Sequence, residues 1–161
     1  MPKLPLTGPG PGPSNPDRPV YTPPGGPPAN TSVSKEIFGH MGEDNVRSMI
    51  SDFYDRLVRS PIANLFPATP EGLVEAKDRS ASFFIFLLGG PPLYQQTYGP
   101  PMMRARHMPF RIDQAARAAW LAEFNAVLDD APAKYAFPEQ HLPGFRAFLD
   151  SFSGWMVNAE G

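Results

Sequence analysis

A single histidine near the middle of the chain is the residue best suited to bind a metal. His107 follows Arg104 and Arg106 and lies two residues before Pro109. Because proline lacks a backbone N–H and disfavours the helical conformation in the residue before it, the sequence predicts a short helix with His107 in its last turn. An imidazole mounted there is either an axial metal ligand or a packed side chain among apolar neighbours.

Two aromatic residues that carry a hydrogen-bond donor lie on predicted helix faces. Tyr54 belongs to a face of apolar residues at i, i+3, i+4 and i+7 spacing, and Trp120 begins a similar stripe with Phe124 and Val127. A buried phenol O–H or indole N–H needs a hydrogen-bond partner. Both residues are therefore either ordinary core aromatics or donors to a polar ligand.

A pair of small residues interrupts an otherwise bulky helix face. Ala76 and Ser80 lie one turn apart, with Leu73 before them and Phe83 or Phe84 after them. Small side chains at this spacing allow close helix packing, or they leave space for a bound group between this helix and its neighbours.

Four main helices are expected to position these residues, with Thr69 and Asp113 as N-caps. No segment alternates with a two-residue period for long enough to form a strand, so the sequence predicts an all-α fold with long Pro/Gly-rich loops. The predicted helices run from Glu43 to Ser60-Pro61, from Pro70 to Gly89-Gly90-Pro91, from Asp113 to about Leu128, and through a stripe of Phe145, Phe148, Leu149, Phe152 and Trp155 or Met156.

Residues 1–33 differ in composition from the rest of the chain. Eleven of the 22 prolines lie there, and apolar periodicity is almost absent. We expect a disordered or polyproline-like extension at 1–33 and a folded domain at 34–161. Pro-x-x-Pro matches such as Pro13 to Pro16 and Pro24 to Pro27 indicate either a solvated tail or a ligand for an adaptor domain.

The composition excludes several classes of function. A net charge of −2 with scattered basic residues argues against a nucleic-acid surface, and the absence of cysteine excludes thiolate metal sites and disulfides. The longest apolar run, Phe83 to Leu88, is too short to cross a bilayer, and the N-terminus lacks a signal-peptide core. We expect a cytoplasmic protein that does not contact membranes.

Taken in order, these motifs resemble those of the group II truncated haemoglobins, which are short globins with a two-over-two helical sandwich. The resemblance covers residues 37 to about 159. It rests on the order of the following motifs, with a tryptophan thirteen residues after the histidine: Phe53-Tyr54, Leu65-Phe66-Pro67, Gly89-Gly90-Pro91, Arg104-x-Arg106-His107-x-Pro109 and Trp120.

The resemblance implies that haem b is the cofactor and that His107 is its proximal iron ligand. It also implies further haem contacts: Phe66 and Phe83 pack on the haem, and Arg79 and Arg106 pair with its propionates. On the distal side, Tyr54 and Trp120 match the residues that hydrogen-bond the bound gas, and Ala76 and Ser80 fall on the helix positions above the iron.

One departure from the family pattern concerns the distal side. The family often carries a bulkier residue where this chain has Ser80, so its hydroxyl either adds a third hydrogen-bond donor and a wetter pocket, or bonds to its own helix backbone. The two remaining histidines, His40 and His141, are expected to be exposed.

The expected function is reversible binding of dioxygen and other diatomic ligands such as CO and NO, with release slowed by distal hydrogen bonds. The alternative is a redox enzyme, either an NO dioxygenase or a peroxidase-like enzyme, served by an external reductase. A third hypothesis is a haem-free helical interaction module. Either a monomer or a homodimer is compatible with the sequence.

Overall fold

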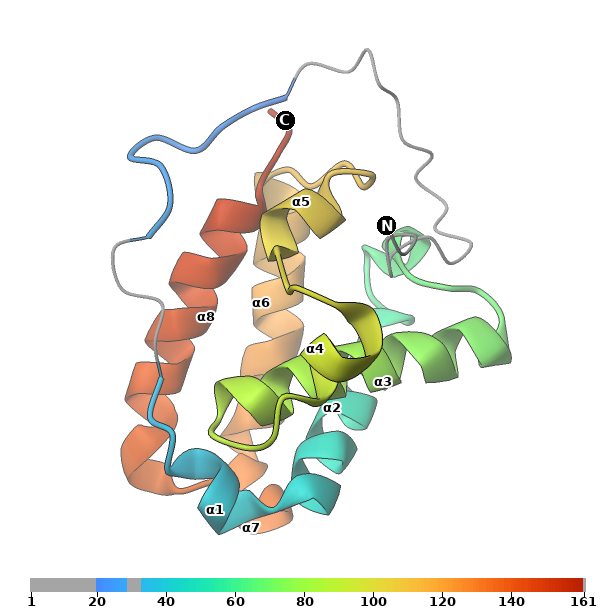
Figure 1. Cartoon of the computed structure of the whole chain (residues 1–161). Helices are drawn as coiled ribbons and strands as arrows, with labels where there is room; N and C mark the ends of the chain where they lie inside the picture. Colours follow the sequence, from blue (N-terminus) through green and yellow to red (C-terminus); the bar gives the residue numbers. More distant parts are fainter. Residues whose placement is uncertain (1–19, 29–32, 161) are drawn as a thin grey trace.

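The computed structural model describes residues 20–28 and 33–160 of the 161-residue chain. The predicted all-α class is confirmed: within the described residues there are eight α-helices, two short 3-10 helices and no strand (Figure 1). The 3-10 helices are Ala63–Leu65 and Glu139–His141. The α-helices are α1 (Ile37–Met41), α2 (Glu43–Leu57), α3 (Pro70–Leu87), α4 (Leu93–Tyr98), α5 (Met103–His107), α6 (Gln114–Asp129), α7 (Ala131–Tyr135) and α8 (Leu142–Met156).

The four long helices form two pairs that pack on each other. Helix α2 pairs with α3, α6 pairs with α8, and α2 also packs against α6 (Figure 1). Aromatic rings fill the space between the pairs: the ring of Phe124 lies 4.1 Å from that of Phe53 and 5.8 Å from that of Phe145, and all three side chains are fully buried. Burial of this aromatic core supplies most of the driving force for the packing.

The predicted helix starts are confirmed by their capping hydrogen bonds. The Thr69 side chain accepts a hydrogen bond of 3.1 Å from the N–H of Gly72 at the start of α3. The Asp113 carboxylate accepts one of 2.8 Å from the N–H of Ala116 at the start of α6. Each cap satisfies an N–H that has no partner within its helix.

The glycine predicted to end α3 is required by a close backbone approach. Gly89 has φ +111°, and a Cβ atom there would lie 2.0 Å from the carbonyl oxygen of Lys35. The N–H of Phe38 donates a 2.9 Å hydrogen bond to the carbonyl of Leu88 at the same crossing. The end of α3 is thereby joined to the start of α1.

Three of the short helices were not predicted. Helices α1, α4 and α7 contain only five or six residues each, which is too short for an apolar period to be read from the sequence. The segment from Gly89 to His107 therefore forms two helices instead of one, and they are separated by Gly99, which has φ +87°, and by Pro100 and Pro101.

Part of the predicted extension contacts the helical domain. The N–H of Tyr21 donates a 3.0 Å hydrogen bond to the carbonyl of Asn158, and Arg104 donates one of 2.9 Å to the carbonyl of Tyr21. These paired backbone groups compensate for ordering the chain there. Residues Pro24 to Pro27 contain a turn at Gly25 and are not a polyproline helix, whereas Pro13 to Pro16 lie outside the described residues.

In the described part of the chain, none of the helices is long and apolar enough to span a bilayer.

Candidate functional site

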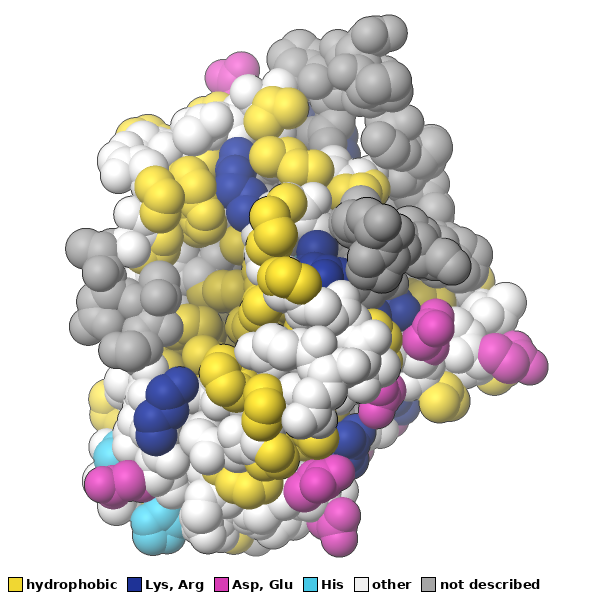
Figure 2. All heavy atoms as spheres, in the orientation of Figure 1, with side chains coloured by type: hydrophobic (Ala, Val, Ile, Leu, Met, Phe, Trp, Pro, Cys, Tyr) yellow, Lys and Arg dark blue, Asp and Glu magenta, His cyan; other side chains and the backbone are white. Residues whose placement is uncertain are grey.

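A largely apolar cavity lies between the two helix pairs and α5. It contains about 1260 Å³ of empty space, counting its open mouth. Figure 2 shows hydrophobic side chains around a hollow between α8 on one side and α4 and α5 on the other. A concave, mainly apolar space with a few polar groups is typical of a cofactor site.

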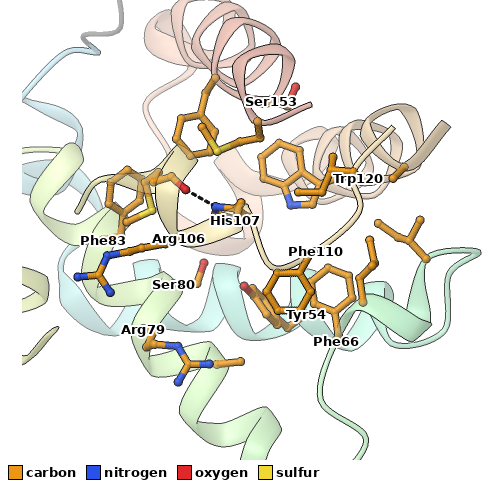
Figure 3. Close-up of a pocket in the computed structure, with 18 of the residues that line it drawn as sticks. Tyr54, Phe66, Arg79, Ser80, Phe83, Arg106, His107, Phe110, Trp120 and Ser153 are labelled. Carbon is orange, nitrogen blue, oxygen red and sulfur yellow. Dashed lines mark hydrogen bonds between the residues drawn. The ribbon is translucent and has the colours of Figure 1, made fainter. Parts of the chain in front are cut away.

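All nine residues predicted to form the site line this one cavity (Figure 3). They come from α2, the segment before α3, α3 itself, α5 and α6, so the tertiary structure brings together residues that are far apart in the sequence. They are Tyr54, Phe66, Ala76, Arg79, Ser80, Phe83, Arg106, His107 and Trp120.

His107 is the last residue of α5, as predicted, and its imidazole is tied to its own helix. Its Nδ1 lies 2.6 Å from the carbonyl oxygen of Met103 (Figure 3). A carbonyl only accepts hydrogen bonds, so Nδ1 carries the proton and Nε2 presents its lone pair. Burial lowers the pKa of His107, although the bond to Met103 opposes the shift. The ring is therefore a neutral imidazole with a free ligating nitrogen.

The segment that follows His107 is held by a buried asparagine near the C-terminus. The amide nitrogen of Asn158 donates to the carbonyls of His107, at 3.2 Å, and Phe110, at 2.9 Å. Its side-chain oxygen accepts a 2.9 Å hydrogen bond from the N–H of Ile112. Arg104 adds a 2.8 Å hydrogen bond to the carbonyl of Val157. These contacts fix the end of α5 against the C-terminal segment.

Tyr54 and Ser80 lie on the opposite side of the cavity. Their hydroxyl groups come close together from α2 and α3 (Figure 3). Burial raises the pKa of Tyr54, although the Ser80 hydroxyl and the positive charge of Arg79 oppose this shift. Tyr54 is thus a neutral phenol at neutral pH, with the Ser80 hydroxyl near its own.

Trp120 lies among aromatic rings at the cavity wall. Its ring centroid is 5.5 Å from that of Phe53, 5.4 Å from that of Phe124 and 6.4 Å from that of Phe152. The contacts with Phe53 and Phe124 are edge-on, and such contacts hold the indole in one orientation. Trp120 is thus part of the aromatic core and also lines the cavity, and its role as a donor to a ligand stays a prediction.

Two arginines are buried at the cavity wall. Arg106 is 4% exposed and donates hydrogen bonds to the carbonyls of Tyr98, at 2.8 Å, and Pro100, at 2.7 Å, while its Nη1 has no hydrogen-bond partner. Arg79 is 8% exposed and forms an ion pair of 3.1 Å with Glu75. A buried guanidinium nitrogen without a partner is costly unless an anionic group binds there.

No group of three or more His, Cys, Asp or Glu side chains in the described part of the chain could hold a metal ion. Among the described residues that line the cavity, His107 is the one His, Cys, Asp or Glu. An iron porphyrin supplies four ring nitrogens and accepts one axial histidine.

Comparison with known families identifies the family of this chain. A model of the bacterial-like globin family matches residues 36–153, which is most of the chain. The protein is a bacterial-like globin. Membership of this family implies a haem cofactor, and the globin cavity described above is where such a group fits.

The similar proteins place this globin in group II of the truncated haemoglobins. A group 2 truncated haemoglobin of Bacillus subtilis, YjbI, is 37% identical over 89 residues, which is 55% of this chain and 66% of that relative. The match thus spans slightly less than two thirds of the relative's length.

Solved structures confirm the two-over-two globin fold. Hell's gate globin IV, in a phosphate-bound crystal structure, superposes with a TM-score of 0.77 and 36% identity, covering 83% of this chain and 81% of that one. The group II truncated haemoglobin of Bacillus anthracis superposes with a TM-score of 0.69 and 28% identity, covering 77% of this chain and 97% of that one. A truncated oxygen-avid haemoglobin of Bacillus subtilis superposes with a TM-score of 0.65 and 30% identity, covering 75% of this chain and 98% of that one.

The residues that line the cavity of this globin fit haem in their chemistry. A haem is a flat apolar group with two carboxylates at one edge, so it needs an apolar slot and cationic partners. The lining is mainly apolar, Arg106 with its orphaned Nη1 and the buried Arg79 are cations at its wall, and His107 has an unprotonated ring nitrogen.

Several residues that line the globin cavity were missed by sequence reasoning. Arg117 and Ser153 form a 3.1 Å hydrogen bond across α6 and α8 at the cavity wall. The position of Arg117 was a usable signal, since it lies one turn before Trp120 on the same helix. The other missed residues include Tyr94, Met103, Phe110, Ile112 and Met156. Met103 had the same signal, since it lies one turn before His107, and Met156 lies on the stripe predicted for the last helix.

The prediction for the two other histidines was correct for one of them. His40 is exposed, but His141 is half-buried, so its predicted exposure was wrong. Nε2 of His141 lies 3.4 Å from the Ser34 hydroxyl and 3.6 Å from the Glu36 carboxylate. Neither histidine lines the cavity, because α1 and the start of α8 lie at the opposite end of the helices.

Proposed function

We propose that this globin holds haem b through His107 and binds dioxygen, and other diatomic gases such as CO and NO, in the same cavity. The observation that carries the proposal is the orientation of the histidine. Its Nδ1–H is occupied by the Met103 carbonyl, which leaves Nε2 as a ligand, and the hydroxyl groups of Tyr54 and Ser80 line the same cavity.

When bound, the haem would supply a ferrous iron with one open coordination position for a gas. The protein's part is to hold the cofactor and shape its surroundings. Arg106 and Arg79 are placed to pair with the carboxylates, and the rings of Phe66 and Phe83 supply apolar contact. Met103 fixes the imidazole through its carbonyl, which also makes Nε2 a stronger ligand.

Tyr54 and Trp120 are proposed to donate hydrogen bonds to dioxygen. Because its pKa is raised, the Tyr54 phenol stays protonated at neutral pH and can donate. We propose that the nearby Ser80 hydroxyl donates to the phenol oxygen, which would leave the Tyr54 proton free to point at the ligand. Two such hydrogen bonds at about 1 kcal/mol each would slow dioxygen release by roughly ten- to a hundredfold.

Slow release suits retention of oxygen better than delivery. The similarity to a haemoglobin described as oxygen-avid supports this proposal. The residues behind slow release in this chain are proposed to be Tyr54, Trp120 and, through Tyr54, Ser80.

The test is the absorption spectrum of the purified protein in the ferric, ferrous and oxygenated forms, followed by the dissociation rate of dioxygen. We expect an intense Soret band, one haem per chain, and an oxygenated form that is stable enough to be recorded. Absence of a Soret band after titration with haem would refute the proposal and favour a haem-free helical module.

A further inference from the structure

Two of the five tyrosines in the chain donate their hydroxyl proton to a carboxylate. Tyr98, the last residue of α4, donates to Oδ2 of Asp78 at 2.6 Å. Tyr135, the last residue of α7, donates to Asp52. In each pair, burial and the carboxylate raise the pKa of the phenol. The two pairs therefore have the same chemistry in two different places.

The first pair is joined to the cavity by ring contacts. Tyr94 lines the cavity wall and is 3% exposed, and its ring centroid lies 5.1 Å from that of Tyr98 and 6.1 Å from that of Phe83. Tyr135 does not line the cavity, and the Nζ of Lys134 lies 5.6 Å from the centroid of its ring. Among the described residues, Tyr98 is thus the one of these two tyrosines with a chain of aromatic ring contacts to the cavity.

The outer end of this contact reaches solvent. Tyr98 is half-buried, and the side chain of Asp78 is 47% exposed. Arg47 holds the carboxylate of Asp78 in place through an ion pair of 3.0 Å, and the second carboxylate oxygen accepts from Tyr98. A proton received by Asp78 can therefore pass to water, and a small molecule can approach Tyr98 from outside.

A tyrosine that loses an electron must also lose its phenolic proton, because the oxidised phenol is a strong acid. An acceptor at hydrogen-bond distance makes this loss possible in one step. Tyr54 also lines the cavity, but the hydroxyl group nearest its own is that of Ser80, which is not a base at neutral pH. The guanidinium carbon of Arg106 lies 5.2 Å from the centroid of the Tyr94 ring. This positive charge disfavours a second positive charge on the Tyr94 ring.

We infer that Tyr98 is a surface oxidation site of this globin: it passes one electron through Tyr94 to haem that a hydroperoxide has oxidised, gives its proton to Asp78, and is then reduced by a small phenolic donor from solvent. This inference rests on the proposed function, because it requires haem in the cavity.

The atoms and electrons balance with hydrogen peroxide as the oxidant. One peroxide takes up two electrons and two protons and gives two waters. Each electron leaves Tyr98 as its O–H bond breaks, and the proton goes to Asp78 and then to solvent. Each Tyr98 radical takes a hydrogen atom from one phenol, so two phenols become two phenoxyl radicals for every peroxide consumed.

The test compares Tyr98→Phe with the matched control Tyr135→Phe in the full-length haem protein. Ferric protein is mixed with hydrogen peroxide and frozen rapidly, and the tyrosyl radical is recorded by electron paramagnetic resonance. Oxidation of guaiacol, a small phenol, is followed in parallel. We expect Tyr98→Phe to remove the main tyrosyl signal and to slow guaiacol oxidation by about tenfold, whereas Tyr135→Phe leaves both unchanged.

A second pair of variants tests the proton acceptor. Asp78→Asn keeps both rings but removes the base, so the radical yield should fall several-fold. Arg47→Gln breaks the same ion pair but retains the carboxylate, and should keep the signal. Tyr98 does not line the cavity, so dioxygen binding by Tyr98→Phe should match that of the unchanged protein.

The outcomes separate this inference from the proposed function. An unchanged radical in Tyr98→Phe, in a protein with a normal Soret band, would overturn the role of Tyr98 and leave haem binding intact. Loss of the radical in Tyr135→Phe would also overturn it, because the inference gives that tyrosine no part in the reaction. A protein without a Soret band before peroxide is added would contradict both.

Discussion

One side of the cavity, which we call the His107 wall, consists of Met103, Arg106, His107 and Phe110. Hydrogen bonds to backbone carbonyls hold these residues in place. Met103 holds the imidazole, and Asn158 holds the turn that follows it. The opposite side, the Tyr54 wall (Tyr54, Ala76, Ser80 and Trp120), is set by side chains that project from long helices with buried apolar faces.

The difference follows from helix length. Helix α5 has five residues, too few to be stable alone, so it depends on contacts from the C-terminal segment and from Tyr21. Helices α2, α3 and α6 have 15, 18 and 16 residues and are held by the aromatic core. We therefore expect the His107 wall to control the retention of haem. We expect the Tyr54 wall to control the dissociation rate of the gas.

The largest effect is expected for His107→Gly, which removes the proposed iron ligand from the His107 wall. The variant should lose haem during purification or exchange it freely, because the remaining apolar and ionic contacts do not bond to iron. Haem content is measured by the Soret band. Added imidazole should restore a histidine-type spectrum, and a variant that retains haem with an unchanged spectrum would contradict the assignment.

A smaller but still large effect is expected for Asn158→Ala. This change removes the hydrogen bonds of the Asn158 side chain to the carbonyls of His107 and Phe110 and to the N–H of Ile112, at a cost of about 2–3 kcal/mol. Haem transfer to an excess of apomyoglobin should accelerate several-fold, while dioxygen dissociation should change little. Tyr135→Phe, which removes a hydrogen bond far from the cavity, is the control for general loss of stability. Equal haem loss in both would show that Asn158 has no particular effect on His107.

On the Tyr54 wall, Tyr54→Phe removes one hydrogen-bond donor without changing the ring. Dioxygen dissociation, measured by stopped-flow replacement with CO, should become about tenfold faster, since loss of about 1.4 kcal/mol is a factor of ten. Ser80→Ala should give a smaller increase, because Ser80 acts through Tyr54. An unchanged rate in Tyr54→Phe would remove this residue from ligand binding. Haem retention should be normal in both variants.

The smallest effect is expected at the start of α6, outside the cavity. Asp113→Ala removes the cap and should lower the free energy of unfolding at pH 7 by about 1 kcal/mol. The pKa of Asp113 is lowered by the Ala116 N–H, despite burial, and by Arg111. A lowered pKa in the folded state stabilises the fold above the carboxyl's ordinary pKa, and this contribution is lost as the pH falls through the folded value. The free energy of unfolding, measured with urea, should therefore differ less between the variant and the parent protein in acid than at pH 7. A difference that grows in acid would contradict the assignment.

The sequence by itself determined the long helices and their starts. Apolar spacing and capping residues act within a few positions, so α2, α3, α6 and α8 and the caps Thr69 and Asp113 could be predicted. The family resemblance supplied nine residues that share one cavity, although their roles toward haem remain predictions.

Only the tertiary structure decided how the short elements are held. The hydrogen bonds of Asn158 and Arg104 end on backbone carbonyls, which every residue type carries, so no residue pattern announces them. Likewise, the hydrogen bonds of Tyr98 to Asp78 and of Ile112 to Asn158 join residues 20 and 46 positions apart. Such contacts exist only once the packed helices have brought the partners together, because neither partner's local sequence specifies the other.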